Sequence, residues 1–345
     1  MSTTAADPVG TPRGGGSSGA VLEIEDLHVT FKTEDGPVYA VRGVDLAVHE
    51  SEVLGVVGES GSGKSVTMLA AMGLLPKSAT ITGSVKFRGE ELLGREQGDV
   101  RRYRGSKIAM IFQDPLTALN PVLKVGDQIA EAVLAHNDMS QNQAYAKAIS
   151  LLDQVGIPQP ATRASQYPHE FSGGMRQRAM IAMAISNDPE VLIADEPTTA
   201  LDVTIQAQIL EVIQEVQEAT KSAVVFITHD LGVIARLATR VRVLYAGRSA
   251  EVGTVDDIFD NPGHPYTVGL MSSIPRGDGS RLRPIPGSPP NMLAPPSGCA
   301  FRPRCRYSAE ICEMEVPMLR VVGKHDQLAA CHFSEQLMGH WDMDA

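Results

Sequence analysis

The chain has 345 residues and a formal net charge of −11, from 41 acidic and 30 basic side chains. This length exceeds one ordinary core, so we expect one large domain and a smaller unit. So acidic a chain is not a general binder of nucleic acid or of an anionic membrane, and any phosphate site must be local. No apolar run reaches the roughly 18 residues of a membrane-spanning helix, so we expect a chain that stays in the cytosol.

The chain divides into three segments by composition. Residues 1–20 are rich in Gly, Ser and Pro and lack an apolar core, which indicates a disordered leader rather than a secretory signal. From 21 to 255, short β-rich apolar runs alternate with longer helical stretches, which is typical of an α/β domain with a largely parallel sheet. Alternation in 21–31 and 38–48 predicts an antiparallel hairpin, the start of an N-terminal antiparallel subdomain. The expected core strands are 53–57, 108–112, 191–194 and 223–228.

A helical subdomain is expected at about 114–188, inside the α/β domain, with helices at 122–136, 143–155 and 175–186. After residue 255 the composition changes, and seven prolines fall between residues 284 and 303. Such a density of proline excludes a regular helix or a central strand. We therefore expect 256–345 to be an irregular extension.

A glycine-rich loop, GESGSGKS, follows the first expected core strand and precedes a helix. It fits the phosphate-binding pattern G-x-x-x-x-G-K-[ST], in which backbone N–H groups and a helix N-terminus face a polyphosphate. Lys64 is expected to neutralise the β- and γ-phosphates, and Ser65 to ligate Mg²⁺. The residues expected to line the triphosphate are Gly58, Glu59, Ser60, Gly61, Ser62, Gly63, Lys64, Ser65 and Val66.

An acidic pair, Asp195 and Glu196, ends the apolar run VLIA. A buried strand gains nothing from acids unless its end faces a cation or a reacting group. Asp195 is placed to hold Mg²⁺ through water. Glu196 is the candidate general base for an attacking water, a role worth about 10²–10⁴ in rate.

Residues 170–178, EFSGGMRQR, resemble the LSGGQ signature of the ATP-binding-cassette (ABC) ATPases. Physically this is a second anion cradle, a Ser-Gly-Gly turn that opens a helix with Ser172 as its N-cap. In that family two cassettes pack head to tail. The resemblance therefore implies that Ser172, Gly173 and Gly174 cap the γ-phosphate bound to the partner's loop. Phe and Met replace the usual Leu and Gln, which is similar to the oligopeptide-importer branch.

The resemblance assigns three further roles along the chain. It implies that Gln113 senses Mg²⁺ and water and couples to the membrane partner, and that His229 is the switch histidine on the γ-phosphate. Asp202 belongs to an Ala-Leu-Asp run similar to the D-loop at the cassette interface. The implied catalytic set is Lys64, Gln113, Glu196 and His229, and the implied Mg²⁺ set is Ser65, Gln113 and Asp195.

The adenine site is left open between two aromatic residues. Phe31 sits where the family stacks an aromatic ring on adenine. Tyr39 is its rival, and Phe31 also fits the core of the hairpin.

The later run GHPYT, residues 263–267, resembles the dipeptide, oligopeptide and nickel importer ATPases, which carry such an extension. The resemblance implies an ATPase on the cytoplasmic face of the membrane that powers peptide import. Its implied partners are a second cassette subunit, two transmembrane permease subunits and, indirectly, an extracytoplasmic substrate-binding protein, with no nucleic acid. Nickel or another small solute stays open as cargo, because the cassette never touches it. A soluble non-transport ABC ATPase and a P-loop kinase are the rivals outside transport.

All four cysteines lie in the extension. Their spacing lacks the close pairs of tight zinc sites, and a reducing cytosol disfavours disulfides. A metal would supply cohesion to this Pro-rich segment, and Arg302, Arg304 and Arg306 are expected to stabilise thiolates. The resemblance implies a [4Fe–4S] cluster, with zinc or free thiols as alternatives. The candidate ligands are Cys299, Cys305, Cys312 and Cys331.

Overall fold

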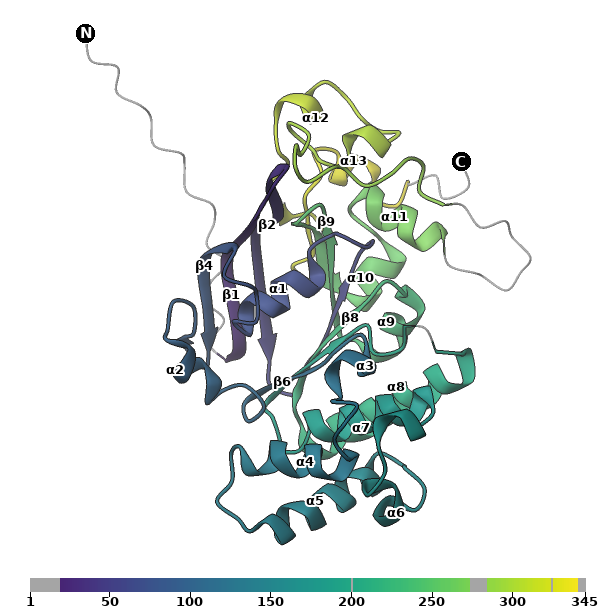
Figure 1. The fold of residues 1–345 in the computed structure, drawn as a ribbon. Helices are drawn as coiled ribbons and strands as arrows, with labels where there is room; N and C mark the ends of the chain where they lie inside the picture. Colours follow the sequence, from purple (N-terminus) through teal and green to yellow (C-terminus); the bar gives the residue numbers. More distant parts are fainter. Residues whose placement is uncertain (1–18, 200, 274–283, 324, 341–345) are drawn as a thin grey trace.

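The computed structural model describes residues 19–199, 201–273, 284–323 and 325–340. The expected leader at 1–20 lies almost wholly outside these residues. Figure 1 shows two sheets side by side, a helical subdomain at the bottom and the C-terminal extension at the top. The ABC cassette architecture expected from the sequence, an α/β domain with an antiparallel N-terminal part, is confirmed.

The N-terminal sheet is antiparallel, with strand order β2-β1-β4-β5. The expected hairpin forms one side of this sheet, and in it Ala20 pairs with His49 and Thr33 with Gly36. The inward-facing residues are Leu, Ile and Val and are fully buried, so the alternation in the sequence marks the core face. The strands are β1 (Ala20–Thr33), β2 (Gly36–His49), β4 (Ala79–Phe87) and β5 (Glu90–Glu91).

The main sheet has eight strands in the order β11-β12-β10-β9-β3-β8-β7-β6. The five strands from β9 to β6 are parallel and almost wholly buried, which explains the apolar sequences of β3, β6, β7 and β8, whereas two arginines interrupt β9 (RVRVLY). They are β3 (Val53–Val57), β6 (Ile108–Ile111), β7 (Val191–Asp195), β8 (Ala223–Thr228) and β9 (Arg240–Tyr245). Parallel pairing brings the carboxyl ends of β3, β6, β7 and β8 to one edge of the sheet.

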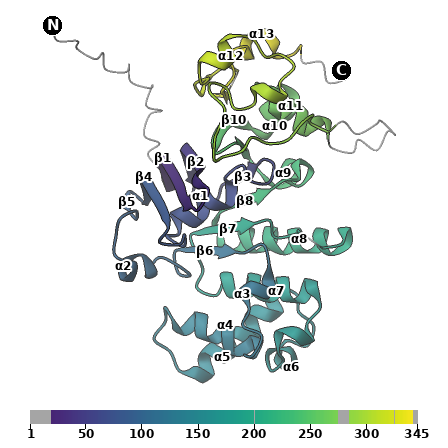
Figure 2. The same cartoon turned by 45° about the horizontal axis from the view of Figure 1, so that its top comes forward.

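The helices of the cassette pack on this sheet and below it. Helices α4–α6 form a group at the end of the molecule remote from the extension (Figure 2). The described helices of this part are α1 (Lys64–Ala71), α2 (Gln97–Arg101), α3 (Pro115–Ala118), α4 (Val125–Leu134), α5 (Gln141–Gln154), α6 (Pro160–Ala164), α7 (Gly173–Ala184), α8 (Val203–Thr220) and α9 (Leu231–Leu237).

Helix α4 begins three residues later than the sequence predicts, and the buried Gln128 explains why. Its amide oxygen accepts from the Asn120 N–H, and its amide nitrogen donates to the carbonyls of Asn120 and Leu123. These bonds hold 120–123 as a turn, so the helix starts only at Val125.

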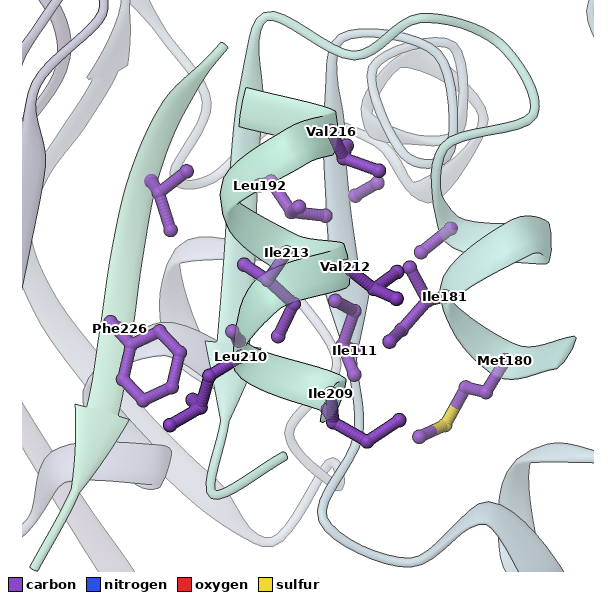
Figure 3. Close-up of a cluster of buried hydrophobic side chains, with 14 of the residues drawn as sticks. Ile111, Met180, Ile181, Leu192, Ile209, Leu210, Val212, Ile213, Val216 and Phe226 are labelled. Carbon is purple, nitrogen blue, oxygen red and sulfur yellow. The ribbon is translucent and has the colours of Figure 1, made fainter. Parts of the chain in front are cut away.

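Helix α8 anchors the helical layer to the sheet. Figure 3 shows Ile209 and Ile213 of α8 among Leu192 of β7 and Ile181 of α7. All four side chains are almost fully buried. Burial of each contributes about 1.5–3 kcal/mol, so this contact fixes the strand that carries the acidic pair.

The extension is only partly irregular. Strand β12 pairs antiparallel with β10 (Arg248–Thr254), and β11 pairs with β12, so two short strands lengthen the main sheet. Both strands follow the proline-dense stretch for which a regular helix and a central strand were excluded, and the sequence analysis did not predict them. Its remaining elements are α10 (Val255–Asp260), α11 (Pro265–Ser272), the 3₁₀ turn η2 (Arg302–Arg304), α12 (Ile311–Met314), β11 (Arg320–Val321), β12 (Leu328–Ala329) and α13 (Ser334–Leu337).

Glu251 of β10 joins the extension to the cassette. Its buried carboxylate accepts hydrogen bonds from the N–H groups of Gly263 and His264 and from the Gln327 amide. Burial raises the pKa of Glu251 to about 7 and lowers that of the fully buried His264 to about 4.

These pKa shifts predict opposing effects of pH on stability. The contribution of Glu251 is complete below pH 4.5 and is lost as pH rises to about 7, at about 1.4 kcal/mol per pH unit. The contribution of His264 is complete above pH 6.5 and is lost as pH falls to about 4. Urea unfolding of the wild type and of Glu251→Gln isolates the first effect, because both proteins carry His264. The stability difference should shrink from pH 4.5 to 7, and a constant difference would contradict the buried-acid account.

Candidate functional site

The glycine-rich loop, hereafter the P-loop, folds as the phosphate pattern requires. Gly58 and Gly63 have φ of 152° and 100°, in the region that side chains avoid. A Cβ at Gly58 would meet the Leu244 carbonyl oxygen at 2.2 Å, and a Cβ at Gly63 would meet the Ala40 oxygen at 2.7 Å. Only glycine fits these two positions, so the loop packs tightly between β9 and the hairpin.

Lys64 begins α1 and is buried beneath this loop. Its ammonium donates to the carbonyl oxygens of Gly58 and Glu59, at 2.7 and 3.0 Å. Burial lowers the pKa of Lys64, while Glu196 and Asp195 act to raise it. The Lys64 charge therefore lies between the P-loop and the acidic end of β7, at the position that the sequence predicts.

Ser65 and Asp195 meet at the predicted Mg²⁺ position. The Ser65 hydroxyl donates to Oδ1 of Asp195 at 2.8 Å. Burial raises the pKa of Asp195, with Glu196 adding to the rise and Ser65 opposing it. The partly buried Ser65 hydroxyl and the buried Asp195 carboxylate are hard oxygen donors, which is the ligand type that Mg²⁺ takes.

Glu196 is the centre of a polar cluster at the strand ends. Its Oε2 accepts from the Gln113 amide at 3.1 Å and from the Thr199 hydroxyl at 2.8 Å, and it lies 3.5 Å from Nδ1 of His229. Glu196 has φ of 45°, a conformation that costs a residue with a Cβ about 1–3 kcal/mol. Such strain is typical of sites where the direction of a side chain matters.

The structure thus brings Gln113, Asp195, Glu196 and His229 together with the P-loop. Thr199 is a member of this cluster that the sequence analysis missed. The sequence could have indicated Thr199 by its position three residues after Glu196, because a side chain at that spacing can reach the carboxylate across the turn.

The signature residues lie elsewhere, at the start of α7. The Ser172 hydroxyl caps this helix by accepting from the Met175 N–H. A Cβ at Gly174 would meet Ile205 of α8 at 2.8 Å, so this turn packs against the D-loop region. Asp202 caps α8 through the Ile205 N–H, whereas Ala200 lies outside the described residues. Among the described residues, no hydrogen bond joins Ser172 to the P-loop of the same chain.

The two candidate adenine residues lie on neighbouring strands of the hairpin. Phe31 is half-buried and packs against the core of the N-terminal sheet together with Val66. Tyr39 is 39% exposed. The adenine contact of Phe31 stays a prediction.

The extension reaches the P-loop, which the sequence analysis also missed. The Tyr266 hydroxyl accepts from the Glu59 N–H, and the Arg304 guanidinium pairs with the Glu59 carboxylate. These partners are 207 and 245 residues apart in the chain, so no local pattern could signal the contact.

All four cysteines line one small pocket of the extension, which His264, Phe301 and Phe333 also line. Each is a free thiol. Within the described ranges, no set of three or more His, Cys, Asp or Glu side chains is arranged to hold a single metal ion. The pocket therefore gathers four thiols around a space without converging them on one point.

Burial outweighs the expected stabilisation of thiolates by arginines, although Arg302 acts to lower the pKa of Cys299. Burial raises the pKa of Cys299, that of Cys305 to about 12 and that of Cys331 to about 11. Arg304 is turned toward Glu59 of the P-loop instead. The Cys305 and Cys331 thiols are therefore protonated at neutral pH.

The fold and this site define an ATP-binding cassette. Residues 41–199 match the family model of the ABC transporter, and 250–312 match that of the oligopeptide/dipeptide transporter C-terminal region. The chain belongs to the ATP-binding proteins of this ABC transporter family and is an ABC ATPase. Within the described part of the chain, no helix is long and apolar enough to cross a membrane.

Similar proteins span nearly the whole chain. It is 54% identical over 301 residues to a dipeptide transport ATP-binding protein of Bacillus subtilis, covering 86% of this chain and 90% of that protein. It is 49% identical over 300 residues to an oligopeptide transport ATP-binding protein of Salmonella typhimurium, with the same two coverages. Among solved structures, the dimeric bacterial ABC transporter cassette MJ0796 matches with a TM-score of 0.61 and 26% identity, covering 68% of this chain and 98% of that one.

The contact between Thr199 and Glu196 predicts a kinetic effect. Thr199→Val removes the hydroxyl but keeps the side-chain shape, so the Glu196 carboxylate loses one of its positioning bonds. We expect kcat for ATP hydrolysis to fall about fivefold, as for the loss of one hydrogen bond, with the Kd for ATP unchanged. Steady-state phosphate release and nucleotide titration measure the two quantities, with Thr199→Ser as the control that retains the hydroxyl. An unchanged kcat in the valine variant would contradict the positioning role.

Proposed function

We propose that this chain is the ATP-hydrolysing subunit that powers peptide import across the cytoplasmic membrane. The convergence of Gln113, Thr199 and His229 on the Glu196 carboxylate, beside the Ser65–Asp195 pair, carries this proposal. The dipeptide and oligopeptide transport relatives support peptide as the cargo. Import of nickel or another small solute is the alternative.

The catalytic step follows from the positions of these side chains. Glu196 accepts a proton from a water as the water oxygen bonds to the γ-phosphorus and the bond to the bridging oxygen breaks, which leaves ADP and phosphate. Gln113 and His229 orient the water and the γ-phosphate. Lys64 exchanges its loop carbonyls for phosphate oxygens and neutralises their charge. Ser65, Gln113 and Asp195 would hold Mg²⁺, which would supply further neutralisation.

The site is completed by a second cassette subunit. The signature turn at Ser172, Gly173 and Gly174 opens α7, and among the described residues no hydrogen bond joins Ser172 to the P-loop of its own chain. Head-to-tail pairing brings it onto the γ-phosphate of the partner and places Asp202 at the interface. The similar cassette MJ0796 has a dimeric structure, which supports pairing with a second cassette.

The membrane subunits dock next to the loop that carries Gln113. Leu116 and Val122 follow Gln113 closely and are 60% and 75% exposed, and Phe112 and Leu123 beside them are also exposed. An apolar surface of this kind is typical of an interaction site. Two permease subunits contact it, so the chain lies at the cytoplasmic face of the membrane, and closure of the cassette dimer moves them. An extracytoplasmic binding protein delivers the peptide.

Replacement of the proposed base tests the enzyme directly. Glu196→Gln keeps the shape and the hydrogen bonds but cannot accept a proton, so ATP turnover should fall about 10²–10⁴-fold. ATP binding should persist, and size-exclusion chromatography with ATP should show a trapped dimer. Glu211→Gln, on the exposed face of α8, is the matched control with normal turnover. Near-normal hydrolysis by Glu196→Gln would refute the assignment.

We further propose that Cys299, Cys305, Cys312 and Cys331 hold a [4Fe–4S] cluster. Four thiols around one pocket are the right donor set for it. When bound, the cluster would cross-link the extension through thiolate–iron bonds. Ligation requires the buried thiols to lose their protons.

Anaerobic purification tests this cofactor. The full chain should be brown and contain about four irons and four sulfides per chain, as the cluster formula requires. Cys305→Ser should lose the absorbance and most of the iron. Zinc in place of iron would favour the single-ion alternative. Colourless, metal-free protein whose four thiols all alkylate in the folded state would refute both metals.

A further inference from the structure

Arg304 extends from the turn before Cys305 to the P-loop. Its side chain is only 3% exposed. Its two terminal nitrogens donate to the two carboxylate oxygens of Glu59, at 2.5 and 3.0 Å. Bidentate pairs of this kind are among the strongest side-chain hydrogen bonds and fix direction as well as distance.

The other donors of Arg304 bind the proline-rich segment that precedes it. The Nε atom donates to the Pro286 carbonyl at 2.9 Å, and Nη2 donates to that of Ile285 at 3.3 Å. The Tyr245 hydroxyl, at the end of β9, lies 3.5 Å from Nη1. One guanidinium therefore connects the P-loop, the main sheet and the extension.

Tyr266 of the HPY run holds the same P-loop residue from the backbone side. Its hydroxyl accepts from the Glu59 N–H at 2.7 Å. Its ring is fully buried and packs against Tyr245 and Phe301, with ring centroids 4.6 and 5.5 Å away. This rigid setting lets the hydroxyl fix the backbone of Glu59.

The extension also flanks the rest of the nucleotide region. The Met292 carbonyl accepts from the Tyr39 N–H at 3.0 Å, on the hairpin that carries the candidate adenine residues. Pro289, Pro290 and Met292 line one pocket together with residues 59–62 of the P-loop. The extension thus flanks the start of the P-loop, where Ser60 and Gly61 stay exposed.

We propose that Arg304 and Tyr266 are positioning residues for ATP binding, acting through Glu59. The P-loop contains three glycines and samples many conformations unless its ends are held, and ordering it costs conformational entropy. Arg304 holds the carboxylate of Glu59 and Tyr266 holds its N–H, so part of the entropy cost of ordering the P-loop is removed before ATP binds. This inference rests on the proposed ATP site and adds that the extension sets its affinity.

The test is nucleotide affinity of full-length variants, measured with a fluorescent ATP analogue and Mg²⁺. We expect Arg304→Met to raise Kd about tenfold and Tyr266→Phe about fivefold, as for the loss of a charged and a neutral hydrogen bond. The KM for ATP should rise in parallel while kcat stays near wild type, because ground state and transition state lose the same contact. Arg320→Met removes the exposed Arg320–Glu335 pair of the same extension and should change neither value.

A double variant separates positioning from general loss of structure. Arg304→Met combined with Glu59→Gln should bind no more weakly than Arg304→Met alone, since Arg304 acts through Glu59. Rescue by Arg304→Lys should be partial. If Arg304→Met does not fold, Tyr266→Phe alone still decides the matter, because it deletes one oxygen.

Two outcomes would overturn the inference. One is wild-type affinity in Arg304→Met and Tyr266→Phe, with or without a lower melting temperature. The other is full additivity of Arg304→Met and Glu59→Gln. Lys64→Ala is the reference for the ATP site. If the wild type binds nucleotide no better than Lys64→Ala, the proposed function is refuted. That result is distinct from the two outcomes that overturn the positioning by the extension.

Discussion

The parallel register of β3, β6, β7 and β8 is the constraint on which the site depends. It places the ends of four strands at one edge of the sheet, so residues from four distant segments meet there. The P-loop follows β3, Gln113 follows β6, the acidic pair ends β7 and His229 follows β8. Helix α8, packed on β7, keeps that edge in place, and the strained backbone of Glu196 is tolerated because its surroundings fix it.

The extension adds a second constraint to the same loop. Glu251 ties the extension to β10 from inside the protein, and Arg304 and Tyr266 then reach Glu59. The four-cysteine pocket lies directly beside these contacts, since Arg304 precedes Cys305 and Phe301 lines the pocket. The net charge of −11 is compatible with this design, because the cations that matter are buried next to the loop.

The sequence was sufficient for the parts of the molecule that local patterns encode. Period-two alternation predicted the hairpin, and glycine spacing predicted the P-loop. Unbroken apolar runs predicted four of the parallel strands but not β9, whose sequence two arginines interrupt. It failed for Thr199, Arg304 and Tyr266, whose importance arises from side-chain contacts made in the folded chain. It failed for β11 and β12, since two-residue strands carry no periodic signal. It also misjudged the cysteines, because burial rather than neighbouring arginines controls their pKa values.

The most direct test of this account is a structure of the full chain with Mg²⁺ and a non-hydrolysable ATP analogue. The account predicts the triphosphate in the P-loop, Mg²⁺ on the Ser65 hydroxyl beside Asp195, Glu196 facing the γ-phosphate, and Glu59 still paired with Arg304. A nucleotide bound away from the P-loop, or a γ-phosphate out of reach of Glu196 in a closed dimer, would contradict it.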